Sequence, residues 1–195
     1  LVQTSSGRKM VLRFRLYDDG LGFRYEFPSQ EGMDSFTVKE ELTQFALGAD
    51  HVAWWLPCDY DTQEYEYTQS RLSQIESLMP EVLDANDPQT TYSLNGVEAS
   101  LQMRTDDGIY INIHEAALVD YPCMHLELDP KTFTFTSHLT PDAQGCKGHI
   151  QAPFRTPWRT IQVAPSAVDQ LASRLILNLN EPCAYEDVSW IKPVK

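Results

Sequence analysis

The strongest constraint on the fold is an alternating pattern near the start of the chain. Over residues 10–17, apolar side chains alternate with charged or polar ones, which is typical of a β-strand with one buried face. Asp18-Asp19-Gly20 follows and favours a tight hairpin turn. Residues 21–27 then alternate in the same way. The sequence therefore predicts an antiparallel hairpin with one face in the core.

Short strand-like segments recur along the chain. They are predicted at 36–47 (with an irregularity near Glu40-Glu41), 52–56, 64–68, 98–104, 108–113 and 131–138. Helical spacing is found only at 70–79 and from 166 to about 175, where Ser-Ala-Val-Asp resembles a capping box. Many short strands with little helix predict an all-β fold with minor α content, a sandwich or barrel of antiparallel strands.

Residues 1–180 are interpreted as one β-sandwich domain, because no internal repeat or long Gly/Ser linker divides them. Residues 181–195 are punctuated by proline and are interpreted as a linker leading onward. The predicted strand Glu64 to Thr68 overlaps an acidic stretch, 59–66 (DYDTQEYE), which we interpret as an exposed strand face. It lacks the spacing of a calcium-binding EF-hand loop.

Charge and composition exclude several classes of function. The formal net charge of −13 repels phosphate backbones, so a nucleic-acid partner is not expected. No apolar run reaches the roughly 18 residues of a membrane span. The cysteines show no C-x-x-C spacing, so free thiols are expected rather than a zinc ribbon; they are Cys58, Cys123, Cys146 and Cys183. Nucleophile-elbow and phosphate-binding glycine motifs are absent.

The segment 109–124 (IYINIHEAALVDYPCM) is the best candidate for a functional site. Its strand ends near Ile113 and brings His114 and Glu115 to the strand edge or the following loop. A carboxylate there suits calcium, which prefers oxygen ligands, but a solvated or salt-bridged glutamate is the alternative. Asp120 is a weaker candidate of the same kind. His114 is interpreted as structural, because zinc needs three or four ligands.

Three tryptophans have two possible roles. Stacking on sugar rings is one, and packing in the core or between domains is the other and the favoured one. They are Trp54, Trp55 and Trp158.

Four segments in order resemble the N-terminal domain of glycoside hydrolase family 97. They are RFRLYDDGLGFRYEFP, INIHEAALVDYPCMHL, TPWRTIQV and LILNLNEPCAYEDVSWIKP. The resemblance implies a β-supersandwich of the galactose-mutarotase type, followed in the parent enzyme by a catalytic (β/α)8 barrel that carries the acid and the base or nucleophile. It also implies substrates with α-linked glucose or galactose, a periplasmic or secreted location, and no catalytic residue or glycosidase activity in this domain alone.

The resemblance also assigns residues. It implies that Glu115 provides one ligand to a calcium ion beside the oligosaccharide substrate, at a site completed by the barrel. It places four further residues near the substrate or the barrel interface, namely Trp158, Arg159, Asn180 and Glu181. Family domains have additional strands before the hairpin, so the beginning is expected to be incomplete, with an unpaired sheet edge that favours self-association.

The chain departs from the family pattern at three positions, His114, Cys123 and Val194. Two rival functions remain. One is an independent carbohydrate-binding module, which requires an exposed aromatic platform. The other is an enzyme of the mutarotase type, which requires a histidine and a glutamate in one cleft, with candidates His114, His125 and His149.

Overall fold

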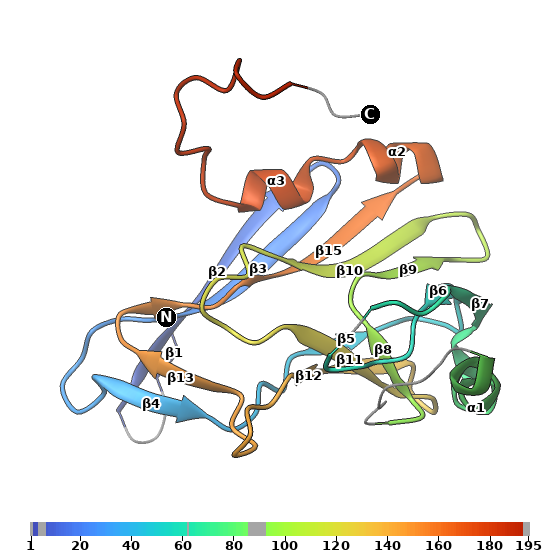
Figure 1. Ribbon diagram of the computed structural model, residues 1–195, viewed down its shortest axis with the longest axis horizontal. Coiled ribbons are helices and arrows are strands. Elements are labelled where there is room, and N and C mark those ends of the chain that lie inside the picture. Colours follow the sequence, from blue (N-terminus) through green and yellow to red (C-terminus); the bar gives the residue numbers. More distant parts are fainter. Residues whose placement is uncertain (1, 4–6, 62, 86–92, 193–195) are drawn as a thin grey trace.

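The computed structural model describes residues 2–3, 7–61, 63–85 and 93–192. These residues form mainly antiparallel strands with three short α-helices and one turn of 3₁₀ helix, which confirms the predicted all-β fold (Figure 1). Val194 lies outside the described residues. No helix in the described ranges is long and apolar enough to cross a membrane.

The elements follow one another along the chain with short connections. The strands are β1 (Val2–Gln3), β2 (Lys9–Tyr17), β3 (Gly20–Phe27), β4 (Ser35–Val38), β5 (Gln44–Ala46), β6 (Val52–Trp55), β7 (Thr68–Arg71), β8 (Gly96–Glu98), β9 (Leu101–Arg104), β10 (Tyr110–Ala116), β11 (Met124–Asp129), β12 (Thr134–Leu139), β13 (Gly148–Gln151), β14 (Phe154–Arg155) and β15 (Trp158–Ala164). The helices are η1 (Leu72–Gln74), α1 (Ile75–Ala85), α2 (Ala167–Ala172) and α3 (Leu175–Leu179).

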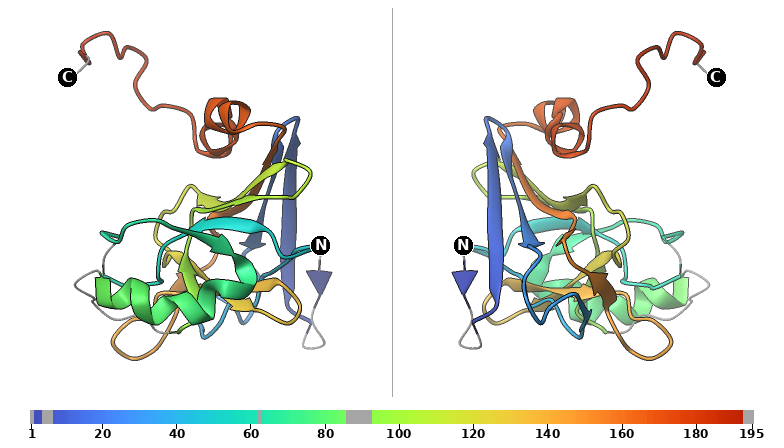
Figure 2. Two further views of the ribbon diagram at one scale, coloured as in Figure 1. Left: turned by 90° about the vertical axis from the view of Figure 1, so that its right-hand side faces the viewer. Right: turned by 90° about the vertical axis from the view of Figure 1, so that its left-hand side faces the viewer.

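Two sheets face each other and enclose the core. The large sheet has the order β1-β2-β3-β15-β10-β9-β6-β7, with β14 beside β3, and the second has the order β5-β12-β11-β8. A separate pair joins β13 to β4. The main apolar cluster draws fully buried side chains from both sheets and from α1, among them Trp55, Leu101, Leu126, Phe135 and Met79. Helices α2 and α3 cover the other face of the large sheet, and the exposed residues 181–192 run away from it (Figures 1 and 2).

The predicted hairpin forms, but both faces of its second strand, β3, pack against other elements. Asp18 and Asp19 make a two-residue turn, with Tyr17 opposite Gly20. At Gly20 the φ angle is +150°, and a side chain would collide with the carbonyl oxygen of Ile161, so only glycine fits. Leu179 of α3 lies against Gly22 of β3, and Gly22 and Arg24 on the polar face of β3 are buried, whereas the apolar face of β3 is only half-buried. The two large apolar side chains at the end of β2, Phe14 and Leu16, remain 55% and 76% exposed.

Several element boundaries differ from the sequence prediction. The predicted strand 64–68 is irregular, and the strand of this region is β7. The interpretation of 59–66 as an exposed strand face is wrong about the strand and only partly right about exposure: the described residues of this stretch form no strand, and Asp59 and Tyr65 are buried while the others are exposed or half-buried. The Tyr65 hydroxyl donates to Asp59 Oδ2 at 3.0 Å. The predicted second helix is split into α2, capped by Ser166, and α3. The first predicted helix begins later, because Ser70 and Arg71 belong to β7.

Candidate functional site

The candidate site is organised around one buried guanidinium. Arg159 on β15 is completely buried, and its Nε and Nη2 atoms donate to the two carboxylate oxygens of Glu41 at 2.8 Å each. Its Nη1 atom donates to Glu115 Oε2 at 2.6 Å. Because a guanidinium offers five donors in a planar fork, one arginine can hold both carboxylates in fixed positions.

The two sheets and one irregular segment bring these three residues together. Glu115 and Arg159 are direct neighbours across the antiparallel pair β10–β15. Glu41 comes from the break between β4 and β5, where its carbonyl accepts a hydrogen bond of 2.6 Å from the hydroxyl of Ser137 on β12. The second carboxylate oxygen of Glu115 accepts from the backbone N–H of Met124, at the start of β11, at 3.1 Å. The cluster therefore ties the large sheet to the second sheet.

Neighbouring hydroxyls complete the environment of Glu41. The hydroxyl of Thr43 donates to its Oε1 at 2.8 Å, and that of Tyr121 donates to its Oε2 at 3.1 Å. Burial and the negative charge of Glu41 raise the pKa of Tyr121, so this hydroxyl stays protonated and remains a donor. Each oxygen of Glu41 thus accepts at least two hydrogen bonds, so the buried carboxylate is fully hydrogen-bonded within the protein.

Electrostatics separate the two glutamates. Burial raises the pKa of Glu115, and the charge of Arg159 offsets this only in part. Burial acts on Glu41 in the same direction, but the hydrogen bonds and charge of Arg159 outweigh it and the pKa of Glu41 is lowered. Two carboxylates and one guanidinium leave one negative charge without a counter-charge. The directions of the two pKa shifts indicate that the charged form is disfavoured at Glu115 and not at Glu41.

A pocket of 410 Å³ opens beside Glu115. Glu98, His114, Cys123 and Asn180 also line it. Two of these, His114 and Cys123, are positions where the resemblance noted in the sequence leads us to expect a different residue, and both line the pocket beside Glu115. Burial lowers the pKa of His114, and its Nδ1 atom is buried without a hydrogen-bond partner in the described part of the chain.

The predicted site residues divide into buried and exposed members. Trp158 is 1% exposed, and the guanidinium groups of Arg15 and Arg24 lie over its ring, at 4.9 and 4.3 Å from the ring centroid. Like the buried Arg159, it is part of the interior. Asn180 and Glu181 are exposed. The side chain of Asn180 accepts from the backbone N–H of Ala117 at 3.1 Å, which anchors the end of α3 beside the Glu115 pocket.

The remaining candidates are a tryptophan and the three histidines of the mutarotase-like hypothesis. Trp55 is fully buried and its Nε1 donates to Ser70 at 3.0 Å, so it packs in the core rather than offering a sugar platform. His125 is buried against Glu98 at 3.3 Å. His149 lies on β13, where it contacts Asp142. Of the three histidines considered for a mutarotase-like site, only His114 lines the pocket with Glu98 and Glu115.

Sequence reasoning did not identify Glu41. The only signal was the interruption of the strand pattern near Glu40-Glu41. A charged pair that breaks an apolar strand pattern marks a bend in the backbone, and here the bend turns Glu41 inward to Arg159, 118 residues away along the chain.

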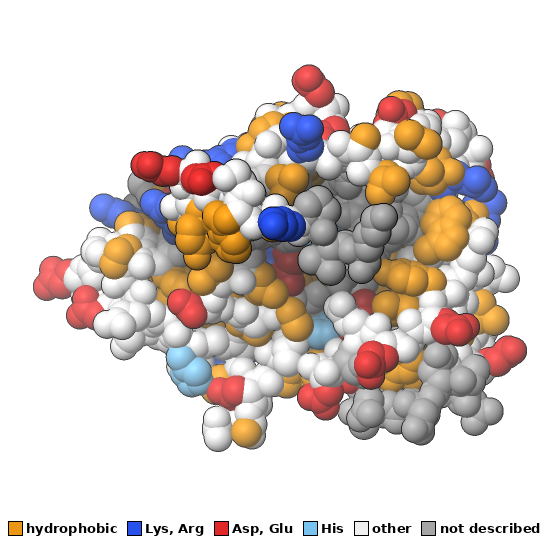
Figure 3. Space-filling view, turned by 45° about the horizontal axis from the view of Figure 1, so that its top comes forward, with side chains coloured by type: hydrophobic (Ala, Val, Ile, Leu, Met, Phe, Trp, Pro, Cys, Tyr) orange, Lys and Arg blue, Asp and Glu red, His pale blue; other side chains and the backbone are white. Residues whose placement is uncertain are grey.

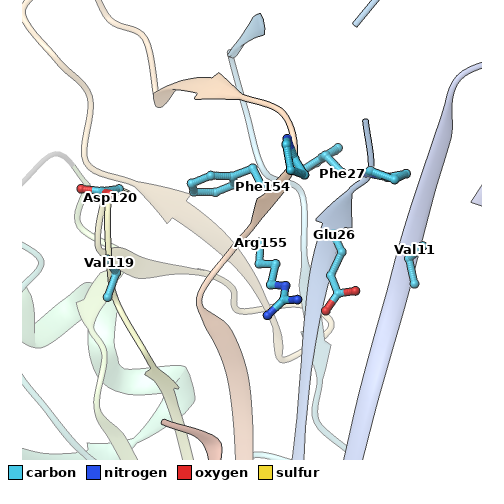
Figure 4. A pocket seen from close by; sticks show the side chains of 9 residues that line it. Val11, Glu26, Phe27, Val119, Asp120, Phe154 and Arg155 are labelled. Carbon is cyan, nitrogen blue, oxygen red and sulfur yellow. The ribbon is translucent and has the colours of Figure 1, made fainter. Parts of the chain in front are cut away.

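A second hollow of 530 Å³ lies between the β3–β14 pair and the loop after β10 (Figure 4). Glu26 and Arg155 line one side of it, Asp120 and Val119 line the other, and the ring of Phe154 lies between the two sides. The lining therefore combines an aromatic ring with charged groups of both signs.

Hydrophobic side chains are also exposed on the side that carries α2 and α3 (Figure 3). Leu171 on α2 is 87% exposed, Val168 on α2 is 74% exposed, and Leu177 on α3 is 71% exposed. The following segment adds Tyr185, Val188, Trp190 and Ile191, all of which are exposed. We call Val168, Leu171 and Leu177 the helical apolar surface.

Comparison with known proteins identifies relatives over almost the whole chain. The family described as "Glycosyl-hydrolase 97 N-terminal" matches residues 1–182. A glycoside hydrolase family 97 enzyme from Pseudoalteromonas sp. strain K8, solved in complex with acarbose, is 38% identical with a TM-score of 0.80 over 97% of this chain. A retaining alpha-galactosidase of Bacteroides thetaiotaomicron is 26% identical over 94% of this chain.

A beta-arabinopyranosidase structure, 22% identical with a TM-score of 0.63 over 84% of this chain, shares the fold. The chain spans only 29% of the length of the alpha-galactosidase and 26% of the length of the two solved structures.

Replacing Arg159 with methionine is expected to destabilise the protein by about 3–5 kcal/mol, because it leaves Glu41 and Glu115 buried without a counter-charge. Urea unfolding followed by circular dichroism measures this. Arg155→Met is the matched control: Arg155 is exposed, and a change of less than about 0.5 kcal/mol is expected. Equal effects of the two substitutions would contradict the central role of Arg159.

Proposed function

Because the chain belongs to glycoside hydrolase family 97 and corresponds to its N-terminal domain, we propose that it is the non-catalytic β-sandwich domain of an α-glycosidase and supplies Glu115 as a calcium ligand beside the substrate site. The observation that carries the proposal is the position of Glu115: it lines a pocket while its carboxylate is fixed from behind.

The residues around Glu115 fit a calcium ion in both charge and chemistry. The Arg159 cluster has one guanidinium for two carboxylates, so a cation at Glu115 would balance it. Each oxygen of Glu115 already accepts one hydrogen bond, from Arg159 or from the backbone of Met124, and keeps lone-pair capacity for a metal ion. Calcium takes six to eight oxygen ligands, so most of them would come from outside this domain.

In this proposal Arg159 acts as a positioning residue. It holds Glu115 in one orientation and, through Glu41, keeps that orientation fixed relative to the second sheet. Calcium bound there would act as a Lewis acid and as a template that positions the sugar. The carboxylates that perform hydrolysis would belong to a separate catalytic domain.

The proposed substrate class is α-linked glycosides. It rests on the relatives, which include a retaining alpha-galactosidase and an enzyme solved with acarbose. The proposed partner in the same chain is the catalytic barrel. The helical apolar surface supports this contact, because three large apolar side chains exposed on two short helices favour burial against another domain.

Glu115→Gln is expected to lower calcium affinity at least about tenfold, equivalent to about 1.4 kcal/mol, because the amide replaces a charged oxygen ligand. Titration calorimetry on the longest natural chain that contains residues 1–195 measures this. Asp129→Asn, which removes an exposed carboxylate at the end of β11, is the control and should leave affinity unchanged. If both variants bind calcium like the native chain, Glu115 is an ordinary structural carboxylate.

Replacing Leu171 and Leu177 together with asparagine tests the domain contact. In the 195-residue chain the change should alter stability by no more than about 0.5 kcal/mol, because both side chains are exposed. In the longer natural chain the melting temperature should fall, because the polar groups would be buried at the interface. Leu42→Asn, which changes an exposed leucine in the β4–β5 segment, is the control. No difference between the two chain lengths would argue against packing through these helices.

A second candidate function is direct sugar binding in the hollow of Figure 4. An aromatic ring flanked by carboxylates and a guanidinium can stack on a sugar face and hydrogen-bond its hydroxyls. Phe154→Ala should abolish the binding of maltotriose or raffinose detected by ligand-observed NMR. Phe14→Ala, on β2 outside this hollow, should leave it intact. Absence of binding by the native chain would remove this candidate.

A further inference from the structure

The loop between β12 and β13 gathers three side chains of different chemistry. One carboxylate oxygen of Asp142, the sulfur of Cys146 and a ring nitrogen of His149 lie within 4.8 Å of one another. We propose that these residues form a binding site for a zinc-like transition-metal ion, separate from the Glu115 pocket.

The backbone of the loop pins two of the ligands together. Asp142 Oδ1 accepts from the N–H groups of Gln144 and Cys146 at 2.9 and 2.8 Å, and the N–H of Asp142 donates to the carbonyl of Cys146 at 2.8 Å. Gly145 makes this turn possible, because its φ angle is +77°. Asp142 Oδ1 is thus fully engaged, and Oδ2 is left to face the other ligands.

The third ligand comes from the strand that follows. His149 lies on β13, opposite Thr37 of β4, and its Nε2 atom lies 2.8 Å from Asp142 Oδ2. A metal ion would take the place of the proton between these two atoms. The imidazole side chain is 67% exposed, so it can rotate to make room without disturbing the core.

The donor set determines which metal fits. A thiolate, an imidazole and a carboxylate suit zinc, whereas calcium and magnesium prefer oxygen ligands alone. Zinc bonds of about 2.3 Å to sulfur and about 2.0–2.1 Å to nitrogen place tetrahedral ligands roughly 3.5 Å apart. The atoms that lie furthest apart therefore have to approach by about 1.3 Å at most, whereas Asp142 Oδ2 and His149 Nε2, which are 2.8 Å apart, have to separate by about 0.7 Å. Rotation of the exposed His149 side chain changes its distances to both other ligands.

The site is open to solvent, and the positive charges of two nearby lysines do not block it. Lys39 donates to the sulfur of Cys146 at 3.4 Å, but its side chain is exposed and can move its ammonium group outward. The ammonium of Lys147 is directed to the carbonyl of Leu139 at 2.7 Å. The three ligands line a hollow of 410 Å³, so a water molecule or an external ligand can take the fourth position.

The test is the binding of zinc alone to the purified chain under reducing conditions, by titration calorimetry, with cobalt as a spectroscopic substitute. The native chain should bind one zinc ion, and cobalt should produce a thiolate-to-metal charge-transfer band. Cys146→Ser should abolish that band, and His149→Ala should weaken zinc binding at least about tenfold. Circular dichroism without metal checks the fold of both variants, and His149→Ala should be unaffected because its side chain is exposed.

Two controls isolate the site. Cys183→Ser removes the exposed thiol of the C-terminal segment and should leave zinc binding and the cobalt band unchanged. Glu115→Gln should also leave zinc binding unchanged, so failure of the calcium proposal and failure of this one are distinguishable. The inference is overturned if the native chain binds no zinc, or if His149→Ala binds it as tightly as the native chain does.

Discussion

The buried guanidinium of Arg159 is the charged link between the two sheets. It joins β15 and β10 to the break between β4 and β5, and through the carbonyl of Glu41 to β12. Buried ion pairs add little net stability compared with apolar packing, because desolvation consumes most of the attraction. Their effect here is specific: only one relative position of the two sheets satisfies three charged groups and the hydroxyls of Thr43 and Tyr121.

The same cluster explains why Glu115 differs from the other buried carboxylates. Glu98 lies against His125, and Asp59 accepts from Tyr65, so each has a local partner. Glu115 shares its cation with Glu41, which takes two of the three guanidinium contacts. Glu115 is a fixed carboxylate with a raised pKa that lines a pocket. A cation beside it would stabilise the charged carboxylate and so offset the desolvation cost of its burial.

The sequence predicted the β2–β3 hairpin and a strand at β10, but not which faces are buried: Phe14 and Leu16 of β2 are exposed, and β10 continues to Ala116 with buried residues on both of its faces. It missed β15 as a strand, because β15 is covered on both sides and has buried residues of every chemical type, including Trp158, Arg159 and Thr160. The stretch 59–66 was misjudged because its acidity suggested solvent, whereas Asp59 is buried and its carboxylate accepts hydrogen bonds from Tyr65 and from the backbone N–H of Asp61. Glu115 was identified through a family resemblance, and Glu41 depended on a tertiary contact that no local pattern encodes.

One short segment, residues 117–123, connects these features. Ala117 and Cys123 line the pocket of Glu115, and Asp120 lines both the hollow of Figure 4 and the hollow beside the proposed zinc ligands. Tyr121 contacts Glu41 through its hydroxyl, and its ring lies 5.8 Å from the guanidinium of Arg159. Because close-packed interiors transmit small displacements, a shift of this segment would alter several hollows at once. The Arg159 cluster contacts Tyr121 in the middle of that segment, so it links the alignment of the two sheets to the loop that borders these hollows.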